Sequence, residues 1–341
     1  MRTFEATTPP EASVSYAVET EIVPRRVFVA GATGVLGREL IPQLLEAGHT
    51  VLGLARTPEK LLQVVKMGAK AVRGDVLEPE TMRRVVQESA PDVVVNLATV
   101  IPLKLRVNPA DWVMNDRVRV EGTSNLLKAA EGLPLRLFIQ ESVGYVSQSQ
   151  ADAWIDENTP LSSHAFVQAT IDMERRVRES ELPTTVLRFG ALLSDDSWHA
   201  QQSVAAIRKG LLPIIGQGES YMSLIHTHDA GRAIVHLMDQ ADHARGRVWI
   251  ASEEEPAQSA EIIPFVAELL KSPSPRRVPA MLARALVGAV TIEVLGASYR
   301  LSSRRLREDL GFRLVYPTYR EIWSHIAGQV EGKSFKFTEF D

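Results

Sequence analysis

The stretch Val-Phe-Val-Ala-Gly-Ala-Thr-Gly-Val-Leu-Gly-Arg-Glu-Leu, residues 27–40, decides the fold. Its first four residues are apolar and predict a buried strand, and a helical pattern begins at Leu36. Gly31, Gly34 and Gly37 lie between the two elements, where they allow backbone amides and a helix N-terminus to approach a pyrophosphate. We therefore predict a dinucleotide-binding loop. The alternative, a glycine-rich turn without a ligand, is disfavoured by the strand before the loop and the helix after it.

Short β-branched runs alternate with longer helical patterns from Arg26 to about Arg188, which is typical of βαβ units around a parallel sheet. The predicted strands are 27–30, 50–54, 71–73, 92–97, 135–139 and 184–188, and the predicted helices include 36–47, 79–88, 112–130 and 166–181. The fold class that we predict is α/β: a Rossmann-type doubly wound parallel sheet with a smaller C-terminal α/β substrate lobe.

Loops lengthen after Gly190, and short strand-like pieces near 212–215 and 247–250 lie among helices at 228–240, 259–270 and 279–286. With this change of pattern, we predict that the chain is divided into four parts. We expect a flexible or partner-docked arm at 1–24, a dinucleotide-binding Rossmann domain at 25–190, a mainly substrate-binding lobe with some Rossmann-completing elements at 191–332, and a tail at 333–341.

The composition excludes several classes of function. A net charge of −4 supplies no basic field for nucleic acid, and the absence of cysteine excludes disulfides, thiolate zinc sites and a thiol nucleophile. No apolar run reaches the roughly 18 residues that a membrane helix needs, and residues 1–24 lack the apolar core of a signal peptide. We expect a cytoplasmic protein that acts on a small molecule, without a nucleic-acid or membrane partner.

The end of the second strand indicates which dinucleotide binds. An acidic residue about 20 residues after the glycine loop normally binds the ribose 2′-hydroxyl of NAD. Leu54-Ala55-Arg56 occupies this place, and Arg56, together with Arg38, can form charge-assisted hydrogen bonds to a 2′-phosphate. NADP(H) is therefore favoured over NAD(H). The alternative is that Arg56 is only a solvated surface cation.

Further cofactor contacts are predicted at later strand ends. Asp75 and Val76 can flank an adenine, and the small residues after the fourth predicted strand leave room for a ribose. The complete predicted cofactor set is Gly31, Thr33, Gly34, Val35, Leu36, Gly37, Arg38, Arg56, Asp75, Val76, Leu97, Ala98, Thr99 and Phe189.

These elements together resemble a known family. The matching segments are G-A-T-G-V-L-G (31–37), G-D-V (74–76), N-L-A-T (96–99), E-G-T-S-N-L-L-K-A-A (121–130), F-I-Q-E-S (138–142), L-R-F-G (187–190), P-I-I-G-Q-G (213–218) and L-I-H-T-H-D-A (224–230). They are similar to the extended short-chain dehydrogenase/reductase superfamily, in its NAD-dependent epimerase/dehydratase branch. The resemblance implies a Rossmann domain, a C-terminal substrate lobe, a nucleotide-sugar or other small-molecule substrate, and a homodimer face on helices 112–130 and 166–181.

The resemblance also implies a catalytic Tyr-x-x-x-Lys pair, in which the lysine lowers the pKa of the tyrosine and the tyrosine exchanges the substrate proton. Counting back from Met173-Glu174-Arg175-Arg176 places Phe166 at the tyrosine position and Thr170 at the lysine position. No tyrosine in the chain has a lysine four residues later, and Arg119 stands where the family's supporting asparagine is expected. The motif is therefore degenerate.

Three residues are candidates for the missing catalytic groups. Ser142 lies at the fifth strand's end, although the family's hydroxyl can align with Val143 instead; Tyr145 lies in the following loop; and His164 precedes Phe166 and has a suitable ordinary pKa. Each also has a non-catalytic alternative: Ser142 satisfies backbone groups, Tyr145 is an aromatic packing residue, and His164 is a polar residue at a helix start.

The segment His226-Thr227-His228-Asp229 contains potential metal ligands, but the resemblance explains it as a brace for the second lobe, and we predict no metal. Three functions remain open. We favour an NADP(H)-dependent reductase or isomerase with a non-standard proton donor, over a redox-neutral enzyme on the same fold and over a non-catalytic NADP-binding sensor or assembly subunit. The substrate is not identified by the sequence.

Overall fold

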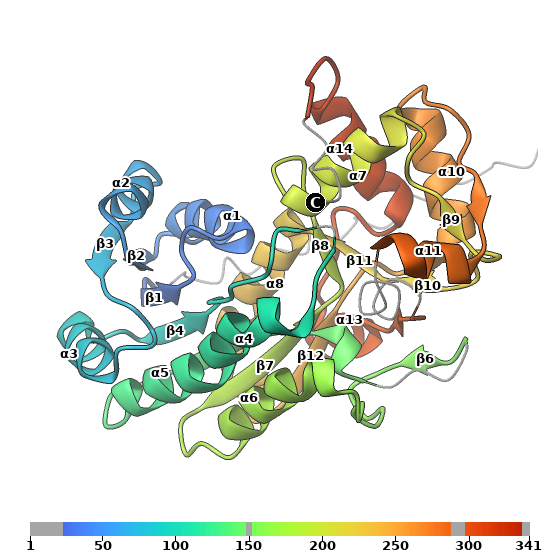
Figure 1. Cartoon of the computed structure of the whole chain (residues 1–341). Coiled ribbons are helices and arrows are strands. Elements are labelled where there is room, and N and C mark those ends of the chain that lie inside the picture. Colours follow the sequence, from blue (N-terminus) through green and yellow to red (C-terminus); the bar gives the residue numbers. More distant parts are fainter. Residues whose placement is uncertain (1–22, 105, 148–151, 288–296, 336–341) are drawn as a thin grey trace, which may run out of the picture.

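The structure, a computed structural model, describes residues 23–104, 106–147, 152–287 and 297–335 (Figure 1). Nearly all of the predicted arm at 1–24, and the last residues of the predicted tail, lie outside the described residues. The central element is a seven-stranded sheet in the order β12-β7-β5-β4-β1-β2-β3. Its strands are β1 (Arg26–Ala30), β2 (Thr50–Ala55), β3 (Lys70–Arg73), β4 (Val93–Asn96), β5 (Leu137–Val143), β7 (Thr184–Phe189) and β12 (Val248–Ala251).

All neighbouring strands of this sheet are parallel. The chain proceeds outward from β1 through β2 to β3, then returns to the other side of β1 to form β4 and β5. The order therefore reverses between β1 and β4, where Ala30 pairs with Asn96. Open α/β sheets bind ligands outside the carboxyl ends of the strands at such a reversal. The predicted α/β fold with a doubly wound parallel sheet is confirmed.

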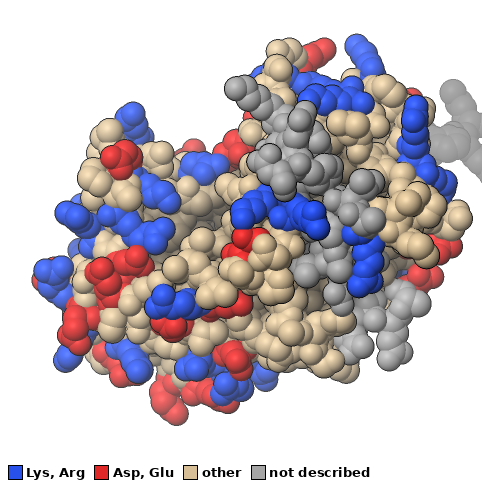
Figure 2. Space-filling view, viewed as in Figure 1, with Lys and Arg blue, Asp and Glu red and all other residues tan. Residues whose placement is uncertain are grey.

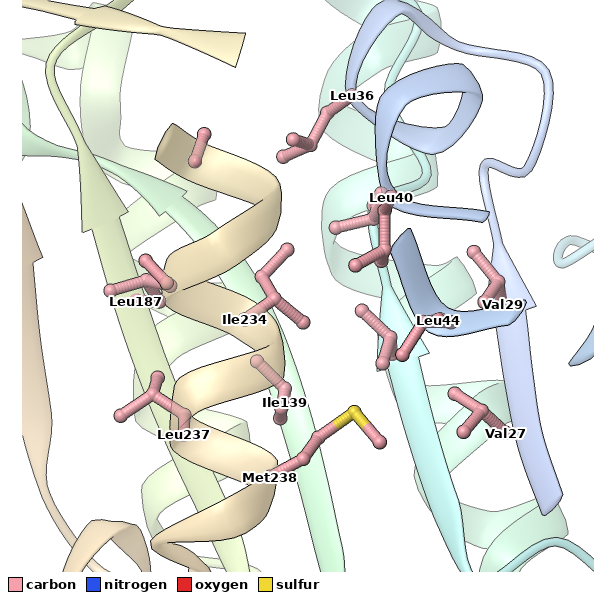
Figure 3. Packing of buried hydrophobic residues seen from close by; sticks show 14 of the residues in the cluster. Val27, Val29, Leu36, Leu40, Leu44, Ile139, Leu187, Ile234, Leu237 and Met238 are labelled. Carbon is pink, nitrogen blue, oxygen red and sulfur yellow. The ribbon is translucent and has the colours of Figure 1, made fainter. Parts of the chain in front are cut away.

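Alternate residues of the buried strands pack against two helical layers. On one face, Val27 and Val29 join a core beneath α1 (Val35–Glu46), α2 (Pro58–Lys66) and α8 (Thr227–Asp239). Figure 3 shows α1 and α8 facing one another, with Leu40 and Leu44 opposite Ile234 and Met238. Complete burial of one such side chain stabilises the fold by about 1.5–3 kcal/mol.

On the other face, Phe28 and Ala30 pack with side chains of α3 (Pro79–Ser89), α5 (Thr123–Ala130) and α6 (Gln168–Arg178). The helix predicted at 112–130 is interrupted: α4 (Pro109–Arg117) continues into a π-helical segment, η1 (Val118–Gly122), before α5 begins. The helix predicted at 166–181 begins with a 3-10 turn, η3 (Ala165–Val167), and ends at Arg178. Single π-helical turns often occur at functional sites.

The second lobe lies beyond the carboxyl ends of the sheet strands, because its first strand follows directly after β7. Helices α7 (Trp198–Arg208), α10 (Ser259–Leu269) and α14 (Tyr319–Gln329) share an apolar core that includes Val204, Ile262 and Ile322. Four strand pairs complete the lobe and its junction: β8 (Ala191–Leu193) with β11 (Leu224–His226), β9 (Ile214–Ile215) with β14 (Arg277–Val278), β10 (Tyr221–Met222) with β13 (Ala257–Gln258), and β6 (Trp154–Ile155) with β15 (Arg300–Leu301). The remaining helices include α9 (Ala241–Ala244), α11 (Ala280–Val287) and α13 (Arg304–Leu310).

The surface carries charges of both signs. On the face in Figure 2, acidic and basic side chains are interspersed over the region of α2, α3 and α5. Among the described residues, no helix combines the length and apolar character required to cross a membrane.

Candidate cofactor and active site

The glycine loop closes tightly on itself and on the end of β4. Gly31 has a φ of +81°, and a Cβ on it would lie 2.5 Å from the carbonyl oxygen of Leu97. A Cβ on Gly37 would lie 2.4 Å from the carbonyl oxygen of Gly31 and 2.6 Å from that of Ala32. Because these neighbours are backbone atoms, larger side chains do not fit. The loop residues therefore fit the close approach of a dinucleotide.

The N-terminus of α1 remains available to an anion. Gly34 is the N-cap of this helix, and no side chain caps it. The Gly34 amide is used within the loop, where it donates to the Gly31 carbonyl at 2.9 Å. Uncapped amides in the first turn of a helix carry partial positive charge and bind phosphate groups. Leu36, predicted as a cofactor contact, is buried and supports the loop from the core.

The end of β4 is held by a buried amide network. The Asn96 side chain donates to Gln140 at 2.9 Å and to Thr123 at 3.0 Å, and its carbonyl oxygen accepts from the Ala98 amide at 3.2 Å. This network positions Leu97 and Ala98 against the glycine loop, at the strand reversal. Phe189, another predicted contact, is buried in the core next to β12.

Arg56 lies at the end of β2, beside the acidic residue that follows β3. Its guanidinium is 3.3 Å from the Asp75 carboxylate, and half of its side chain is exposed, so it can bind an anion from solvent. Arg38 makes a different interaction. Its guanidinium donates to Asp196 at 2.6 Å and to the Thr33 carbonyl at 3.1 Å, so it connects the glycine loop to the second lobe.

Phe166 and Thr170, which we predict to replace the catalytic pair, lie where α6 begins. Thr170 is buried, with 6% exposure. The Phe166 ring is 4.7 Å from the Trp112 ring and 6.3 Å from the Tyr145 ring. Phenylalanine has no exchangeable proton and threonine carries no charge, so these two side chains cannot supply the family's proton relay.

Ser142 lies in a fully buried ion-pair network. Its hydroxyl donates to Glu174 at 2.6 Å, and Glu174 also accepts two bonds from Arg188, at 2.9 and 2.6 Å. The network joins β5, α6 and β7. Because its hydroxyl is used there, Ser142 has a structural role in this arrangement, and a direct part in catalysis stays a prediction. The next residue, Val143, is almost completely buried.

Tyr145 lies in a 3-10 turn, η2 (Gly144–Val146), directly after β5. The pKa of the Tyr145 phenol is raised to about 12, mainly by burial; the Arg119 charge opposes this rise, and nearby Glu141 adds to it. A tyrosine in this environment stays protonated and can donate a hydrogen bond, but it is difficult to ionise. The family arrangement, in which a lysine lowers the pKa of tyrosine, has the opposite effect.

His164 precedes η3 and is exposed. Its backbone starts the turn: the amide donates to Ser162 at 3.1 Å, and the carbonyl accepts from the Val167 amide at 3.2 Å. Thus the structure brings Tyr145 and Phe166 together and places His164 at the start of the same turn. No observation tests a catalytic role for His164, which stays a prediction.

Sequence reasoning missed a buried charge pair beneath the reacting end. Arg119, in the π-helical segment, lies 3.5 Å from Glu141 on β5, and both side chains are almost fully buried. Burial raises the pKa of Glu141, whereas the Arg119 charge lowers it. The sequence does contain one signal for this pair: Glu141 is an acidic residue in the apolar segment F-I-Q-E-S, and a charge in a buried strand requires a partner.

The segment that resembles a metal site is occupied by structural contacts. Asp229 is fully buried and accepts bonds from the Val315 and Tyr316 amides at 2.9 and 2.8 Å. His226 accepts a bond from the His228 amide at 3.2 Å. The part of the chain that the structure describes contains no group of three or more side chains suited to hold a metal ion. These residues brace α8 against the second lobe.

The parallel sheet, the strand reversal and the glycine loop define a Rossmann-type nucleotide-binding protein. The profile of the NAD dependent epimerase/dehydratase family matches residues 27–251, and the chain belongs to this family.

Two curated relatives are reductases. The chain is 31% identical over 305 residues to a 3-diazoavenalumate denitrifying reductase of a Streptomyces species, covering 87% of this chain and 98% of the relative. It is 26% identical over 301 residues to a 2-alkyl-3-oxoalkanoate reductase of Shewanella oneidensis, covering 82% of this chain and 73% of that one. Among solved structures, the human epimerase family protein SDR39U1 with NADPH superposes with a TM-score of 0.74 at 22% identity, covering 89% of this chain and 99% of that one.

Proposed function

We propose that the protein is an NADP(H)-dependent reductase of a small organic substrate. Two relatives that are reductases support the reaction type, and the human structure with NADPH supports the coenzyme. In this proposal the glycine loop and the amides of α1 hold the pyrophosphate, and Arg56 binds the 2′-phosphate. When bound, NADPH supplies a hydride.

The observation that carries the proposal is the chemistry of the reacting end. Phe166 and Thr170 offer neither a proton nor a positive charge there, and the raised pKa of Tyr145, about 12, makes this phenol a weaker proton donor than an ordinary tyrosine. A carbonyl reduction needs a proton for the developing alkoxide, which the family's tyrosine and lysine normally supply. These side chains therefore favour a substrate whose reduction requires no proton from the protein.

Replacement of a diazonium group by hydrogen meets this requirement. A hydride forms the new C–H bond, the C–N bond breaks, and its electron pair leaves with dinitrogen, so no proton is consumed. The name of the Streptomyces relative describes a denitrifying reductase of a diazo compound. We infer that this chain reduces a diazonium substrate in the same manner, with its side chains binding and orienting the substrate and excluding water.

The test uses the full chain, 4-carboxybenzenediazonium and NADPH that carries deuterium at C4, with the benzoate product analysed by mass spectrometry. We expect benzoate to form faster than in a protein-free sample and to carry one deuterium from the coenzyme. When the reaction is repeated in D₂O with unlabelled NADPH, we expect the benzoate to carry no deuterium. The matched control is Gly37→Ala, in which the coenzyme loop is blocked. Deuterium taken from solvent, or a rate equal to that of the protein-free sample, would contradict the proposal.

A further inference from the structure

Four aromatic side chains meet at the reacting end, and we name them the aromatic cluster: Trp112, Tyr145, Phe166 and Tyr299. Trp112 and Phe166 make an edge-to-face contact at 4.7 Å. Tyr145 is 6.3 Å from Phe166 on one side and 5.9 Å from Tyr299 on the other. The rings come from α4, η2, η3 and the residue before β15, so the cluster is built by chain folding and not by one local sequence motif.

The cluster is only partly buried. Each of its four residues has intermediate exposure, so the cluster is not sealed inside the core. Phe166 occupies the position predicted for the family's catalytic tyrosine, and Tyr145 follows the carboxyl end of β5. This is the edge of the sheet at which an α/β fold binds its ligands. The cluster therefore lies at the same edge of the sheet as the predicted coenzyme site.

We propose that the aromatic cluster binds a planar aromatic or conjugated substrate by ring stacking. Aromatic rings attract one another in offset and edge-to-face geometries at centroid separations of about 4.5–7 Å. A nucleotide sugar presents many hydroxyl groups that require polar partners, and Phe166 provides none. This inference rests on the proposed function, because it names the substrate class of the same site.

The test measures binding by calorimetry on the full chain saturated with NADP⁺. The probes are trans-cinnamate, its saturated counterpart 3-cyclohexylpropanoate, and UDP-glucose. We expect trans-cinnamate to bind about tenfold more tightly than 3-cyclohexylpropanoate, since one aromatic pair contributes about 0.5–1.5 kcal/mol beyond the area it buries. Equal affinities for the two carboxylates, or preferential binding of UDP-glucose, would overturn the inference.

Variants locate the binding surface. Trp112→Leu and Tyr299→Leu are each expected to weaken trans-cinnamate binding three- to tenfold, by the loss of one aromatic contact. Trp154→Leu is the matched control, because Trp154 is 47% exposed and its ring lies under the Arg300 guanidinium, outside the cluster. Equal loss in all three variants would also contradict the inference. Melting temperatures and NADP⁺ affinities are recorded for each, so that a misfolded variant is recognised.

The two proposals fail in different measurements. If NADP⁺ does not bind, or if no coenzyme deuterium enters benzoate, the proposed function is wrong. If coenzyme binding and deuterium transfer occur but trans-cinnamate has no advantage over its saturated counterpart, only the aromatic-substrate inference is wrong.

Discussion

Replacing Arg56 with aspartate tests the choice of coenzyme directly. Arg56 lies at the end of β2 with half of its side chain exposed, and its contact with Asp75 is 3.3 Å long. In Arg56→Asp the guanidinium is lost and two carboxylates face the region of a 2′-phosphate. We expect weaker binding of NADPH with little change for NADH, which has no 2′-phosphate.

The size of the effect follows from the interaction that is lost. A hydrogen bond to a charged group contributes about 1.5–3 kcal/mol, which corresponds to a roughly 10- to 150-fold loss of NADPH affinity. The fold itself should be little affected, because an exposed ion pair such as Arg56–Asp75 contributes about 0–1 kcal/mol. Coulomb repulsion from the new carboxylate adds about 1 kcal/mol at 4 Å in water and decreases with salt.

Calorimetric titration of the wild type and the variant with NADPH and NADH, at low and high salt, measures both affinities. Arg178→Asp is the matched control: it makes the same charge change on an exposed residue at the far end of α6. Equal loss of NADPH and NADH affinity in Arg56→Asp, or the same NADPH loss in Arg178→Asp, would refute the 2′-phosphate assignment.

Three further predictions concern the loop, the buried ion pair and acid stability. Gly37→Ala should abolish calorimetric binding of both coenzymes, because its Cβ meets backbone carbonyls at 2.4 and 2.6 Å, whereas Gly328→Ala, with nothing within 4 Å, should bind as the wild type does. Glu174→Gln should lower the free energy of unfolding in urea by about 3–5 kcal/mol, because it leaves the Arg188 charge buried without a counter-ion; a loss below 1 kcal/mol would contradict this. Burial lowers the pKa of His226 from 6.5 to about 4, so the unfolded chain binds a proton that the folded protein excludes. The wild type should therefore lose stability as pH falls from 6.5 toward 4. Urea titrations of His226→Gln across this interval should show a free energy of unfolding that depends less steeply on pH than in the wild type. The same pH dependence in both proteins would contradict this prediction.

Local sequence pattern was sufficient for the sheet because buried parallel strands are nearly continuous apolar runs. The pattern predicted that β5 ends at Ile139, whereas the strand continues to Val143. The residues between them are polar and depend on distant partners: Gln140 on Asn96, Glu141 on Arg119 and Ser142 on Glu174. Such pairs are separated by 22 to 44 positions in the chain, so no local pattern contains them.

The same limit applies to the site. The glycine loop was predictable because its chemistry is encoded in consecutive residues. Arg38 and Arg56 looked alike in sequence, yet Arg38 pairs with Asp196 from the second lobe and Arg56 with Asp75 from the neighbouring strand. The aromatic cluster was likewise not predicted, because its rings come together only when β5, α4 and the segment before β15 have folded.

The position of β12 has a consequence for how this protein can change. The chain leaves the sheet after β7, forms part of the second lobe, and returns to add β12 beside β7. Residues 191–226 are thus an excursion from within the nucleotide-binding fold, to which the chain returns with α8, and not a module appended to it. Removing or exchanging everything after β7 would remove the edge strand β12 from the sheet. We therefore expect substrate preference in this chain to change by replacement of the excursion alone, because both of its ends stay connected to the same hydrogen-bonded sheet.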